Sequence, residues 1–394
     1  MRVLTVGNMY PPHHLGGYEL MWRSSVEHLR SLGHEVRVLT SDYRRREPDD
    51  AIPEDPEVDR RLRWYWRDHA WPRLRFGDRL RLERWNLGLL DHHFRQFRPD
   101  VVAWWAMGGM SRSPIATVSR RGRPAVGVVV DDWLLYGPKE DQWQRAMRRL
   151  GRLRRLAEGA TGVPASLRFD DSVAWIAVSE AIRRRARGGG WRLADSEIAH
   201  GGVDHDLFRP APEQPWRGRL AYVGRIDPRK GLRTAILALA RLPGMALTIT
   251  GSGDAVHLAE LEALVREHDL DDRVSFERRP RSELSAAYAS ADAVLFPVLW
   301  DEPWGLVPLE AMAVGVPVVA TGTGGSGEYL VGGENCLIFE PGEDPAALAE
   351  AIARLRDEPP LRARLRTGGL ATAAGFREES FNLAVAAALE RVAA

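Results

Sequence analysis

The stretch DEPWGLVPLEAMAVGVPVVATGTGGSGEYL (301–330) places two glutamates, Glu302 and Glu310, on either side of a Trp-Gly turn. Pro303 and Pro308 argue against one continuous helix through both carboxylates, because an interior proline removes a helical hydrogen bond and clashes with the preceding turn. Pro308 instead suits the first turn of a helix, so the stretch predicts a loop followed by a helix with Glu310 in its first turn.

Short apolar runs flank this helix at 291–298 and 316–321, which predicts a strand, loop, helix and strand. Ligands gather where such strands end and helices begin. Backbone N–H groups at Trp304, Gly305 and Leu306 would face an anion there. Ionised carboxylates only accept hydrogen bonds, and sugar hydroxyls donate them. Anion and hydroxyl sites together predict a ligand such as a nucleotide sugar.

Length and composition limit the classes of protein this chain can belong to. With 394 residues the chain predicts two domains, and a net charge of +1 argues against nucleic acid as the main partner. The single cysteine, Cys336, excludes an internal disulfide framework and fits a reducing compartment. The apolar run in the opening MRVLTVGNMY is far shorter than the apolar region of a secretory leader, and no stretch of about 18 apolar residues predicts a membrane span.

Lysine is rare: of 55 basic residues only Lys139 and Lys230 are lysines. Lys230 lies with Arg225 in YVGRIDPRKG (222–231), directly after an apolar run, so both cations would leave a strand end. Such a pair would bind a diphosphate and stabilise its charge as it departs. The alternatives are a chance survival of lysine and a turn with solvated basic residues.

Strand and helix signals alternate in both halves of the chain, which predicts two doubly wound parallel sheets. A proline-rich segment at 202–218 separates the halves as a linker would. Expected strands are 3–7, 35–40, 100–106, 125–130 and 173–179 in the first half, and 219–224, 245–251, 274–276, 291–298 and 316–321 in the second. The segment 43–98, between the expected strands 35–40 and 100–106, is expected to be a polar, Arg- and Trp-rich insertion.

Two glycine-rich stretches need separate interpretations. Gly16 and Gly17 follow the first strand, and their backbone could approach a phosphate; an ordinary tight turn is an equal alternative. GTGGSG (322–327) matches the dinucleotide pattern, but it does not lie at the first strand of a domain, and Gly332 and Gly333 interrupt any following helix. We therefore interpret it as a flexible loop near the donor.

The motifs VGRIDPRKG, EPWGLVPLEAMAVGVPVVAT, GGSGE, GGYE and GVDHDLFRP together resemble those of the family 4 retaining glycosyltransferases of GT-B architecture. The resemblance covers nearly the whole chain. It implies two Rossmann-like domains facing a central cleft, net retention at the anomeric carbon, and no required metal. Expected boundaries are 1–205 for an acceptor-side domain, 206–372 for a nucleotide-sugar domain, and 373–394 for a helix that crosses back to the first domain.

The resemblance also implies site roles. Arg225 and Lys230 would hold the donor diphosphate, Glu302 would contact the transferred sugar, and Glu310 the ribose hydroxyls. A UDP- or GDP-sugar is the expected donor, and Glu302, Arg225 and Lys230 are the expected catalytic residues. The full expected donor-binding set is Gly16, Gly17, Gly224, Arg225, Lys230, Gly251, Arg279, Glu302, Trp304, Gly305, Leu306 and Glu310.

The chain departs from the family pattern in two places. Many members carry a histidine after the strand equivalent to 125–130, whereas this chain reads VVVDDWLL (128–135). Asp131 and Asp132 could substitute for it, or could simply cap a helix. The second departure is VSFERRP (274–280), where an arginine replaces a glycine near the nucleobase and leaves the base open.

The acceptor is expected to be a hydroxyl of a small molecule, a sugar or a lipid-linked sugar. Expected acceptor-side residues are His13, Trp104, Trp105, Asp131 and Asp132; one of the two tryptophans would pack in the core, and the other would stack on an acceptor ring. His13 could also be ordinary polar surface. The segment 143–156 has leucines at helical spacing, six arginines and no acid, which suits an anionic membrane surface or a solvated helix face.

Two rival functions follow from the same residues. A nucleotide-sugar-binding protein without turnover would keep the same pocket, although the complete set of Arg, Lys and Glu argues against it. An NAD-dependent oxidoreductase would need a glycine fingerprint at the first strand of a domain, and VGNMYPPHHLGG (6–17) lacks one. The expected location is the cytoplasm, with a peripheral position at the inner membrane face if the basic segment binds lipid.

Overall fold

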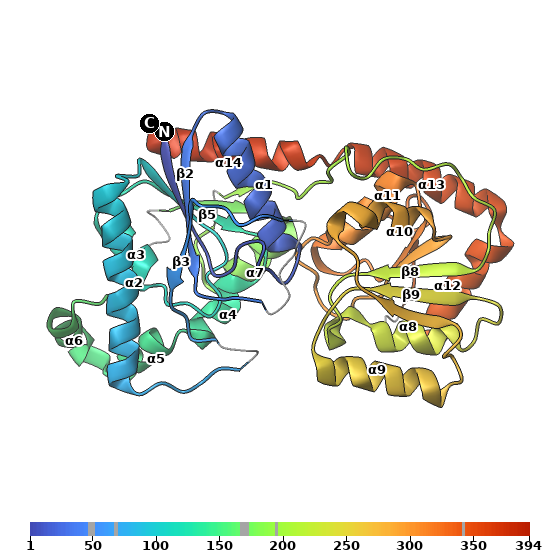
Figure 1. The fold of residues 1–394 in the computed structure, drawn as a ribbon, viewed down its shortest axis with the longest axis horizontal. Coiled ribbons are helices and arrows are strands. Elements are labelled where there is room, and N and C mark those ends of the chain that lie inside the picture. Colours follow the sequence, from blue (N-terminus) through green and yellow to red (C-terminus); the bar gives the residue numbers. More distant parts are fainter. Residues whose placement is uncertain (46–51, 67–69, 166–172, 194–195, 341–342) are drawn as a thin grey trace. The chain divides into compact units, whose positions relative to one another are not determined.

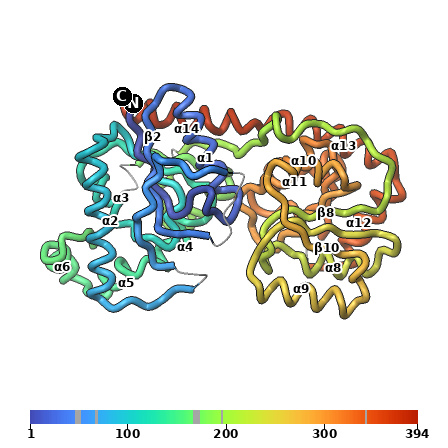
Figure 2. Tube along the Cα trace, in the orientation of Figure 1, coloured from blue at the N-terminus to red at the C-terminus, as the bar shows by residue number. Residues whose placement is uncertain are grey.

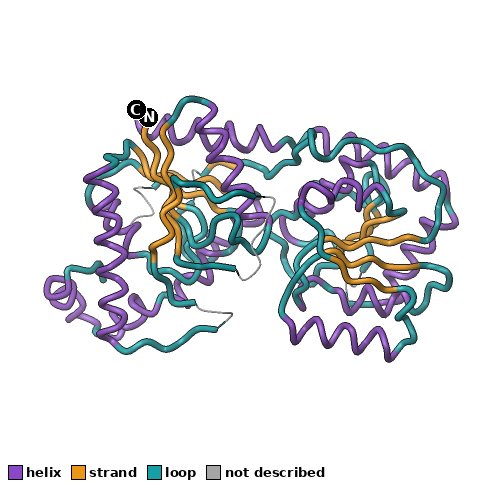
Figure 3. Tube along the Cα trace, viewed as in Figure 1, coloured by secondary structure: helices purple, strands orange, loops and turns teal. Residues whose placement is uncertain are grey.

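A computed structural model of the chain describes residues 1–45, 52–66, 70–165, 173–193, 196–340 and 343–394. The contacts between residues divide the chain into two compact units. Unit 1 comprises Met1–His200 and Phe381–Ala394, and unit 2 comprises Gly201–Ser380. Figure 2 follows the chain through both units, and Figure 3 shows that each contains a sheet with helices around it.

Unit 1 is built on a seven-stranded parallel sheet in the order β3-β2-β1-β4-β5-β6-β7. The strands are β1 (Arg2–Val6), β2 (Glu35–Ser41), β3 (Val58–Leu62), β4 (Val101–Trp104), β5 (Ala125–Val129), β6 (Ala174–Ala177) and β7 (Glu197–Ile198). The helices are α1 (Gly17–Ser31), α2 (Phe76–Gln96), α3 (Ser113–Arg120), α4 (Trp133–Glu140), α5 (Gln142–Arg149), α6 (Arg154–Thr161), α7 (Glu180–Gly188) and most of α14 (Glu378–Ala393). Helices α2 and α3 lie together on one face of the sheet, and α1 and α14 on the other (Figure 1).

Helix α14 is joined to α1 by side-chain hydrogen bonds within unit 1. Ser25 Oγ donates to Asn382 Oδ1 at 2.7 Å, and Asn382 Nδ2 donates to Ser24 Oγ at 2.8 Å. Phe381 packs against Trp105 with ring centroids 6.4 Å apart. The end of the chain is therefore an integral part of the core of unit 1.

Unit 2 has a six-stranded parallel sheet in the order β10-β9-β8-β11-β12-β13. The strands are β8 (Arg219–Val223), β9 (Ala246–Thr250), β10 (Val274–Glu277), β11 (Ala293–Phe296), β12 (Val318–Ala320) and β13 (Leu337–Ile338). The helices are α8 (Leu232–Leu239), α9 (Ala255–Glu267), α10 (Leu284–Ala289), α11 (Leu306–Val314), α12 (Pro345–Asp357) and α13 (Pro359–Ala374). Helices α8 and α9 cover one face of the sheet, and α10 and α11 cover the other (Figure 1).

Both sheets reverse their strand order at one point, and this position determines where a ligand can bind. In unit 2 the sequence order runs outward from β8 on one side and from β11 on the other. In unit 1 the reversal falls between β1 and β4. Loops leaving the carboxyl ends of the two central strands diverge at such a point and open a crevice for a ligand. The two doubly wound sheets expected from the sequence are confirmed.

The segment 43–98 is more regular than the polar insertion expected from its sequence. It contains strand β3 and the 21-residue helix α2, which buries Leu82, Leu89 and Leu90. Strand β3 was missed because it lies at the edge of the sheet and reads VDRRL, with little apolar character. Among the described residues no helix is both long and apolar enough to cross a membrane.

Candidate functional site

Three loops at the carboxyl ends of β8, β11 and β12 meet at Glu302 in unit 2. Lys230 Nζ lies 2.6 Å from Glu302 Oε2, and Trp300 Nε1 donates to the same oxygen at 2.8 Å. Lys230 ends the short 3-10 helix η2 (Pro228–Lys230), which follows β8. The two residues that the sequence singled out, 72 positions apart, are thus in direct contact.

Two glycines with positive φ allow these loops to approach each other. Gly231 has φ 71°, and a Cβ there would lie 1.8 Å from the carbonyl oxygen of Pro297. Gly324 has φ 65°, and a Cβ there would lie 2.3 Å from the carbonyl oxygen of Glu302. Both positions exclude a side chain on steric grounds and favour glycine for backbone conformation. The backbone of Glu302 is fixed further by a 2.6 Å hydrogen bond from Gly325 N–H.

The GTGGSG stretch was expected to be a flexible loop, but it forms the 3-10 helix η4 (Gly324–Glu328). Thr323 Oγ1 donates to Trp300 O at 2.7 Å, and Thr321 Oγ1 donates to Val298 O at 2.8 Å. These bonds connect the loop after β12 to the loop after β11. The loop after β12 therefore holds the backbone that leads up to and includes Glu302, which is a structural reason for its glycines and hydroxyls.

Arg225 lies on the loop that leaves the end of β8, two residues after the strand, and is partly exposed. Its Nε is 3.8 Å from Asp227 Oδ2, and Arg229 Nη2 is 2.8 Å from the same carboxylate. Burial opposes ionisation of Asp227, but hydrogen bonds from Arg229 and the charge of Arg225 hold its pKa well below the usual range. Asp227 therefore remains ionised and offsets part of the positive charge that Arg225, Arg229 and Lys230 bring to the end of β8.

Glu310 is buried in an ion pair that the sequence did not reveal. Arg281 Nη1 lies 2.8 Å from Glu310 Oε1, and Tyr288 OH donates to Glu310 Oε2 at 2.9 Å. Helix α11 begins at Leu306 rather than at Pro308, so Glu310 is its fifth residue and lies just past the first turn. Arg281 and Tyr288 were missed because no spacing in the sequence connects them to Glu310.

Two other expected donor-binding residues of unit 2, Arg279 and Gly251, have structural contacts of different kinds. Arg279 is paired with Glu277 at 2.7 Å, whereas Arg281 two positions later reaches Glu310. Gly251 must be glycine for a structural reason, because a Cβ there would lie 1.8 Å from the carbonyl oxygen of Gly224. The ends of β8 and β9 thus pass each other closely beside Arg225.

The side chain of Trp304 belongs to the core of unit 2. Its Nε1 donates to Gly201 O at 2.8 Å, and its ring packs against Tyr329 and Phe376 with centroids 5.0 and 5.4 Å away. Tyr329 OH in turn donates to Gly305 O, at the start of α11. The contacts of Trp304 and Tyr329 therefore hold the Trp-Gly turn against the core of unit 2. Helix α11 begins after the turn at Leu306, and its N-cap residue, Gly305, has no side chain.

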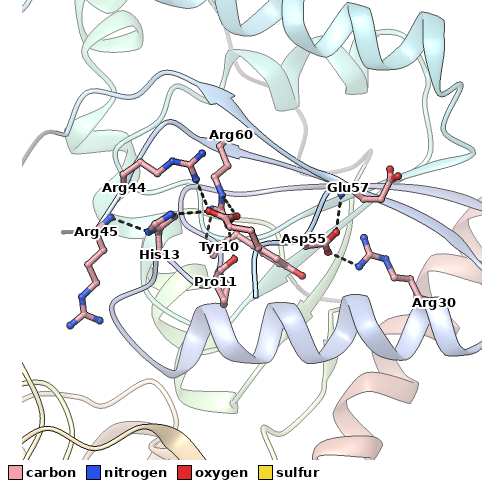
Figure 4. A network of polar contacts seen from close by, with 10 residues as sticks. Tyr10, Pro11, His13, Arg30, Arg44, Arg45, Asp55, Glu57 and Arg60 are labelled. Carbon is pink, nitrogen blue, oxygen red and sulfur yellow. Dashed lines mark hydrogen bonds and ion pairs between the residues drawn. The ribbon is translucent and has the colours of Figure 1, made fainter. Parts of the chain in front are cut away.

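In unit 1 the loop after β1 is held by a network of charged residues (Figure 4). Arg60 donates to the carbonyl oxygens of Tyr10 and Pro11 at 2.8 and 2.6 Å. His13 Nε2 lies 3.1 Å from Glu54 Oε1, and its Nδ1 accepts from Arg45 N–H at 3.2 Å. Burial and the nearby arginines lower the pKa of His13. His13 is thus a buried, neutral part of this loop rather than polar surface.

The same loop leads into α1 through the two glycines expected to bind phosphate. Gly16 is the N-cap residue in extended backbone conformation, and its N–H donates to Glu19 Oε2 at 3.0 Å. Gly17 is the first residue of the helix. The glutamate in the first turn occupies one backbone donor and places a negative charge beside this helix N-terminus.

The expectation that Trp104 or Trp105 stacks on an acceptor is corrected by their burial. Both rings are buried. Trp104 pairs in register with Val6 and Gly127 in the middle of the sheet, and Trp105 stacks on Trp22 with ring centroids 5.8 Å apart. Neither ring has a face to offer a ligand, because core packing covers both.

The two aspartates after β5 take different partners. Asp131 accepts from Trp133 N–H at 3.1 Å and from Tyr136 OH at 2.6 Å, so its side chain binds the first residue of α4 from just before the N-cap. Asp132 accepts from Arg185 Nε at 2.9 Å. Among the described residues no group of three or more His, Cys, Asp or Glu side chains could hold a metal ion.

Residues 208–371 match the family described as glycosyl transferases group 1, and residues 15–207 match glycosyltransferase family 4. A sucrose-phosphate synthase from Thermosynechococcus elongatus superposes with a TM-score of 0.74 at 21% identity, covering 100% of this chain and 99% of that one. Anabaena HepE does so with 0.72 at 19%, covering 99% and 100%.

These matches define the class of protein as a glycosyltransferase of GT-B architecture, with two units that each carry a parallel sheet flanked by helices. The glycogen synthase of Mycobacterium tuberculosis is 29% identical over 389 residues, which covers 91% of this chain and 87% of that protein. A D-inositol 3-phosphate glycosyltransferase of Frankia alni is 34% identical over 201 residues, covering 46% of this chain and 49% of that protein. The chain belongs to family 4 of the glycosyltransferases, as its motifs indicated.

Proposed function

We propose that this glycosyltransferase moves a sugar from a nucleoside-diphosphate donor to an acceptor hydroxyl, with net retention at the anomeric carbon and without a required metal ion. The bond between the anomeric carbon and the diphosphate breaks, the acceptor oxygen forms the new bond to that carbon, and the departing diphosphate takes up the proton of the acceptor hydroxyl. Fold alone does not determine such a function, because one architecture hosts many reactions. The proposal therefore rests on the chemistry of the residues at the end of β8 and β11.

The observation that carries the proposal is the contact between Lys230 and Glu302 at the reversal point of the unit 2 sheet. A lysine has three N–H donors, and the contact with Glu302 uses one of them. The remaining donors suit phosphate oxygens, while Oε1 of Glu302 suits a sugar hydroxyl. One cation and one carboxylate in contact thus match the junction between the diphosphate and the sugar of the proposed donor.

Arg225 completes the proposed diphosphate site. It is a second fixed cation on the loop after β8, and the charge of a departing diphosphate is stabilised by cations already in place. Well-placed donors of this kind contribute roughly 3–4 kcal/mol each to lowering a barrier. Such stabilisation supports departure of the diphosphate without a divalent ion, which is why we propose metal independence.

The nucleoside is proposed to bind beside Glu310. Its two carboxylate oxygens accept from Arg281 and Tyr288, and a carboxylate oxygen can accept more than one hydrogen bond, so ribose hydroxyls could still donate to it. Arg279 and its neighbours lie on the adjacent loop and are the proposed contacts to the base. Structures of Anabaena HepE contain UDP and UDP-glucose, so a uridine sugar is the first donor to test, followed by guanosine sugars.

The acceptor is proposed to bind unit 1, at the carboxyl ends of β1 and β5 where His13 and Asp131 lie. The buried Trp104 and Trp105 are excluded from this proposal. The proposed domain roles follow the order of the chain, with the acceptor side in the N-terminal half and the donor side in the C-terminal half.

A panel of UDP- and GDP-sugars tested by thermal shift, with the free diphosphates as references, would identify the donor. Hydrolysis or transfer would then be followed with the best donor, and the anomeric configuration of the early product would be read by proton NMR. Stabilisation by a nucleotide sugar without any turnover on an acceptor panel would favour a binding protein. An inverted product would contradict retention.

A further inference from the structure

The segment RRLGRLRRL (148–156) forms an exposed corner of unit 1 that the proposed reaction does not use. The longer segment 143–156 was expected to be one helix, but Gly151 has φ 52° and the chain breaks there into α5, the 3-10 helix η1 (Gly151–Leu153) and α6. Figure 1 shows α5 and α6 at one end of unit 1. We call residues 148–156 the basic corner.

Three leucines of the basic corner contribute nothing to the core beneath it. Leu150, Leu153 and Leu156 are 39%, 60% and 72% exposed. The same helices bury other residues, since Trp143 and Met147 of α5 pack in a core cluster with Tyr65 and Leu82. The exposure of the leucines is therefore a feature of the corner and not of a poorly packed region. Contiguous exposed apolar side chains usually mark a binding surface.

The charge around these leucines has one sign. Arg148, Arg149, Arg152, Arg154 and Arg155 are all exposed, and the sequence has no acid between residues 142 and 157. The next acid, Glu158, is paired with Arg120. Elsewhere on the described surface arginines commonly lie beside carboxylates, as Arg61 does beside Asp59. The corner thus carries five positive charges without a carboxylate of its own.

We propose that the basic corner is a docking surface for an anionic lipid membrane. Arginines beside exposed leucines suit the interface of a bilayer, where apolar side chains enter the acyl boundary and cations contact acidic headgroups. Nucleic acid would satisfy the arginines but would leave the leucines exposed to water. The proposal does not depend on glycosyl transfer, and its test measures binding alone.

The test is co-sedimentation of the full chain with vesicles of phosphatidylcholine, with and without about 30% phosphatidylglycerol. We expect binding to the anionic vesicles only. Each basic residue near such a surface contributes about fivefold to binding, so the variant R149Q/R152Q/R154Q should bind roughly a hundredfold more weakly. The variant L153S/L156S keeps every charge and should still lose at least tenfold, because it removes the apolar contact.

Two matched controls use leucines of unit 1 that lie outside the corner. Leu32 and Leu383 are each 48% exposed, and L32S and L383S should bind vesicles like the unchanged chain. Failure of the unchanged chain to bind anionic vesicles would overturn the proposal. Unchanged binding by L153S/L156S would also overturn the proposal. The corner would then bind through its positive charge alone, as it would bind nucleic acid. Leucine-dependent dimerisation without vesicle binding, seen by light scattering, would assign the corner to a second copy instead.

Discussion

Lys230 Nζ lies 2.6 Å from Glu302 Oε2, and both side chains are mostly buried. The contact joins the only lysine of unit 2 to the first glutamate of the spaced pair. An ion pair with little exposure is sensitive to geometry, because the loss of either partner leaves a charge without compensation. We therefore expect activity to be lost when either residue is replaced by one that keeps the charge but changes the shape of the side chain.

Replacing Lys230 by arginine tests this directly. The planar guanidinium is larger than an ammonium group and would have to fit between Glu302 and the Trp300 ring, whose centroid lies 5.3 Å from Nζ. We expect Lys230→Arg to lose about a hundredfold or more in kcat/KM, nearly as much as Lys230→Ala. Donor turnover and circular dichroism would be measured together. Full activity of the arginine variant would show that lysine is not required at this position.

Trp300 is expected to position Glu302 through a single hydrogen bond. Trp300→Phe keeps an aromatic ring beside Arg229 and Lys230 but removes the N–H that Glu302 accepts at 2.8 Å. One hydrogen bond to a charged group contributes about 1.5–3 kcal/mol, so kcat should fall roughly tenfold or more while the donor KM changes little. A rise in KM with unchanged kcat would mean that Trp300 binds the donor instead.

The two glutamates should differ in the kinetic constant they affect. Glu302→Gln should lower kcat more than donor affinity, because its proposed contact to the sugar would tighten as the anomeric centre gains positive charge. Glu310→Gln should mainly raise KM, because ribose contacts do not change during the reaction. Calorimetry with the free nucleoside diphosphate separates the two effects. Unchanged diphosphate affinity in Glu310→Gln would contradict its ribose role.

The stability of these variants should differ as well, which the sequence did not suggest. Glu310 is buried against Arg281 and Tyr288, so its neutralisation leaves the partly exposed Arg281 without its counter-charge. Removing one partner of such a pair costs up to about 3–5 kcal/mol, and less where solvent reaches one side. We therefore expect a lower thermal midpoint for Glu310→Gln than for the unchanged chain.

Most strands could be predicted because a parallel sheet buried on both faces reads as short apolar runs. Residues 3–7, 125–130 and 291–298 gave β1, β5 and β11 in this way. Strand β3 escapes this signal because it is only partly buried and reads VDRRL, with charged residues in place of an apolar run. Helix α2 also escaped it, within a segment rich in arginine and tryptophan.

The candidate site could be predicted where a sequence motif identifies the residue. It could not be predicted where several neighbouring residues of the same type could make the contact. Lys230 and Glu302 were singled out by rarity and spacing, and they are in contact. The arginine beside Glu310 could not be identified, because residues 278, 279 and 281 are equivalent in sequence and only the path of the loop selects Arg281. The predicted acceptor contact of Trp104 or Trp105 was wrong, because the position of a residue at a strand end does not reveal whether core packing will cover its side chain.

Chelation tests the proposed metal independence. Arg225 and Lys230 are fixed cations that would stabilise the departing diphosphate, so donor hydrolysis or transfer should stay within about twofold after treatment with EDTA. The assay would include added manganese and magnesium after chelation. Loss of activity with EDTA and recovery with manganese would contradict the proposal and would require a metal bound together with the donor.

The last prediction concerns the pH dependence of stability in unit 1, where Glu83 is fully buried. Burial, and then the charge of Asp141, raise the pKa of Glu83 to about 8 from an ordinary 4.5, and its carboxyl accepts from Tyr65 OH. Because its folded-state pKa is raised, the Glu83 carboxyl contributes to the free energy of unfolding; this contribution is complete below pH 4.5 and is lost as the pH rises through about 8.

The variant Glu83→Gln tests this, because its side chain carries no titrating proton. The thermal midpoint of this variant, minus that of the unchanged chain, should therefore increase from pH 5 to pH 8 and level off above it. Subtraction cancels the titration of groups that do not interact with Glu83, and Glu35→Gln, at an exposed position on β2, supplies the same substitution outside the buried site as a control. A difference for Glu83→Gln that does not change between pH 5 and pH 9 would mean that Glu83 is ionised in the folded protein.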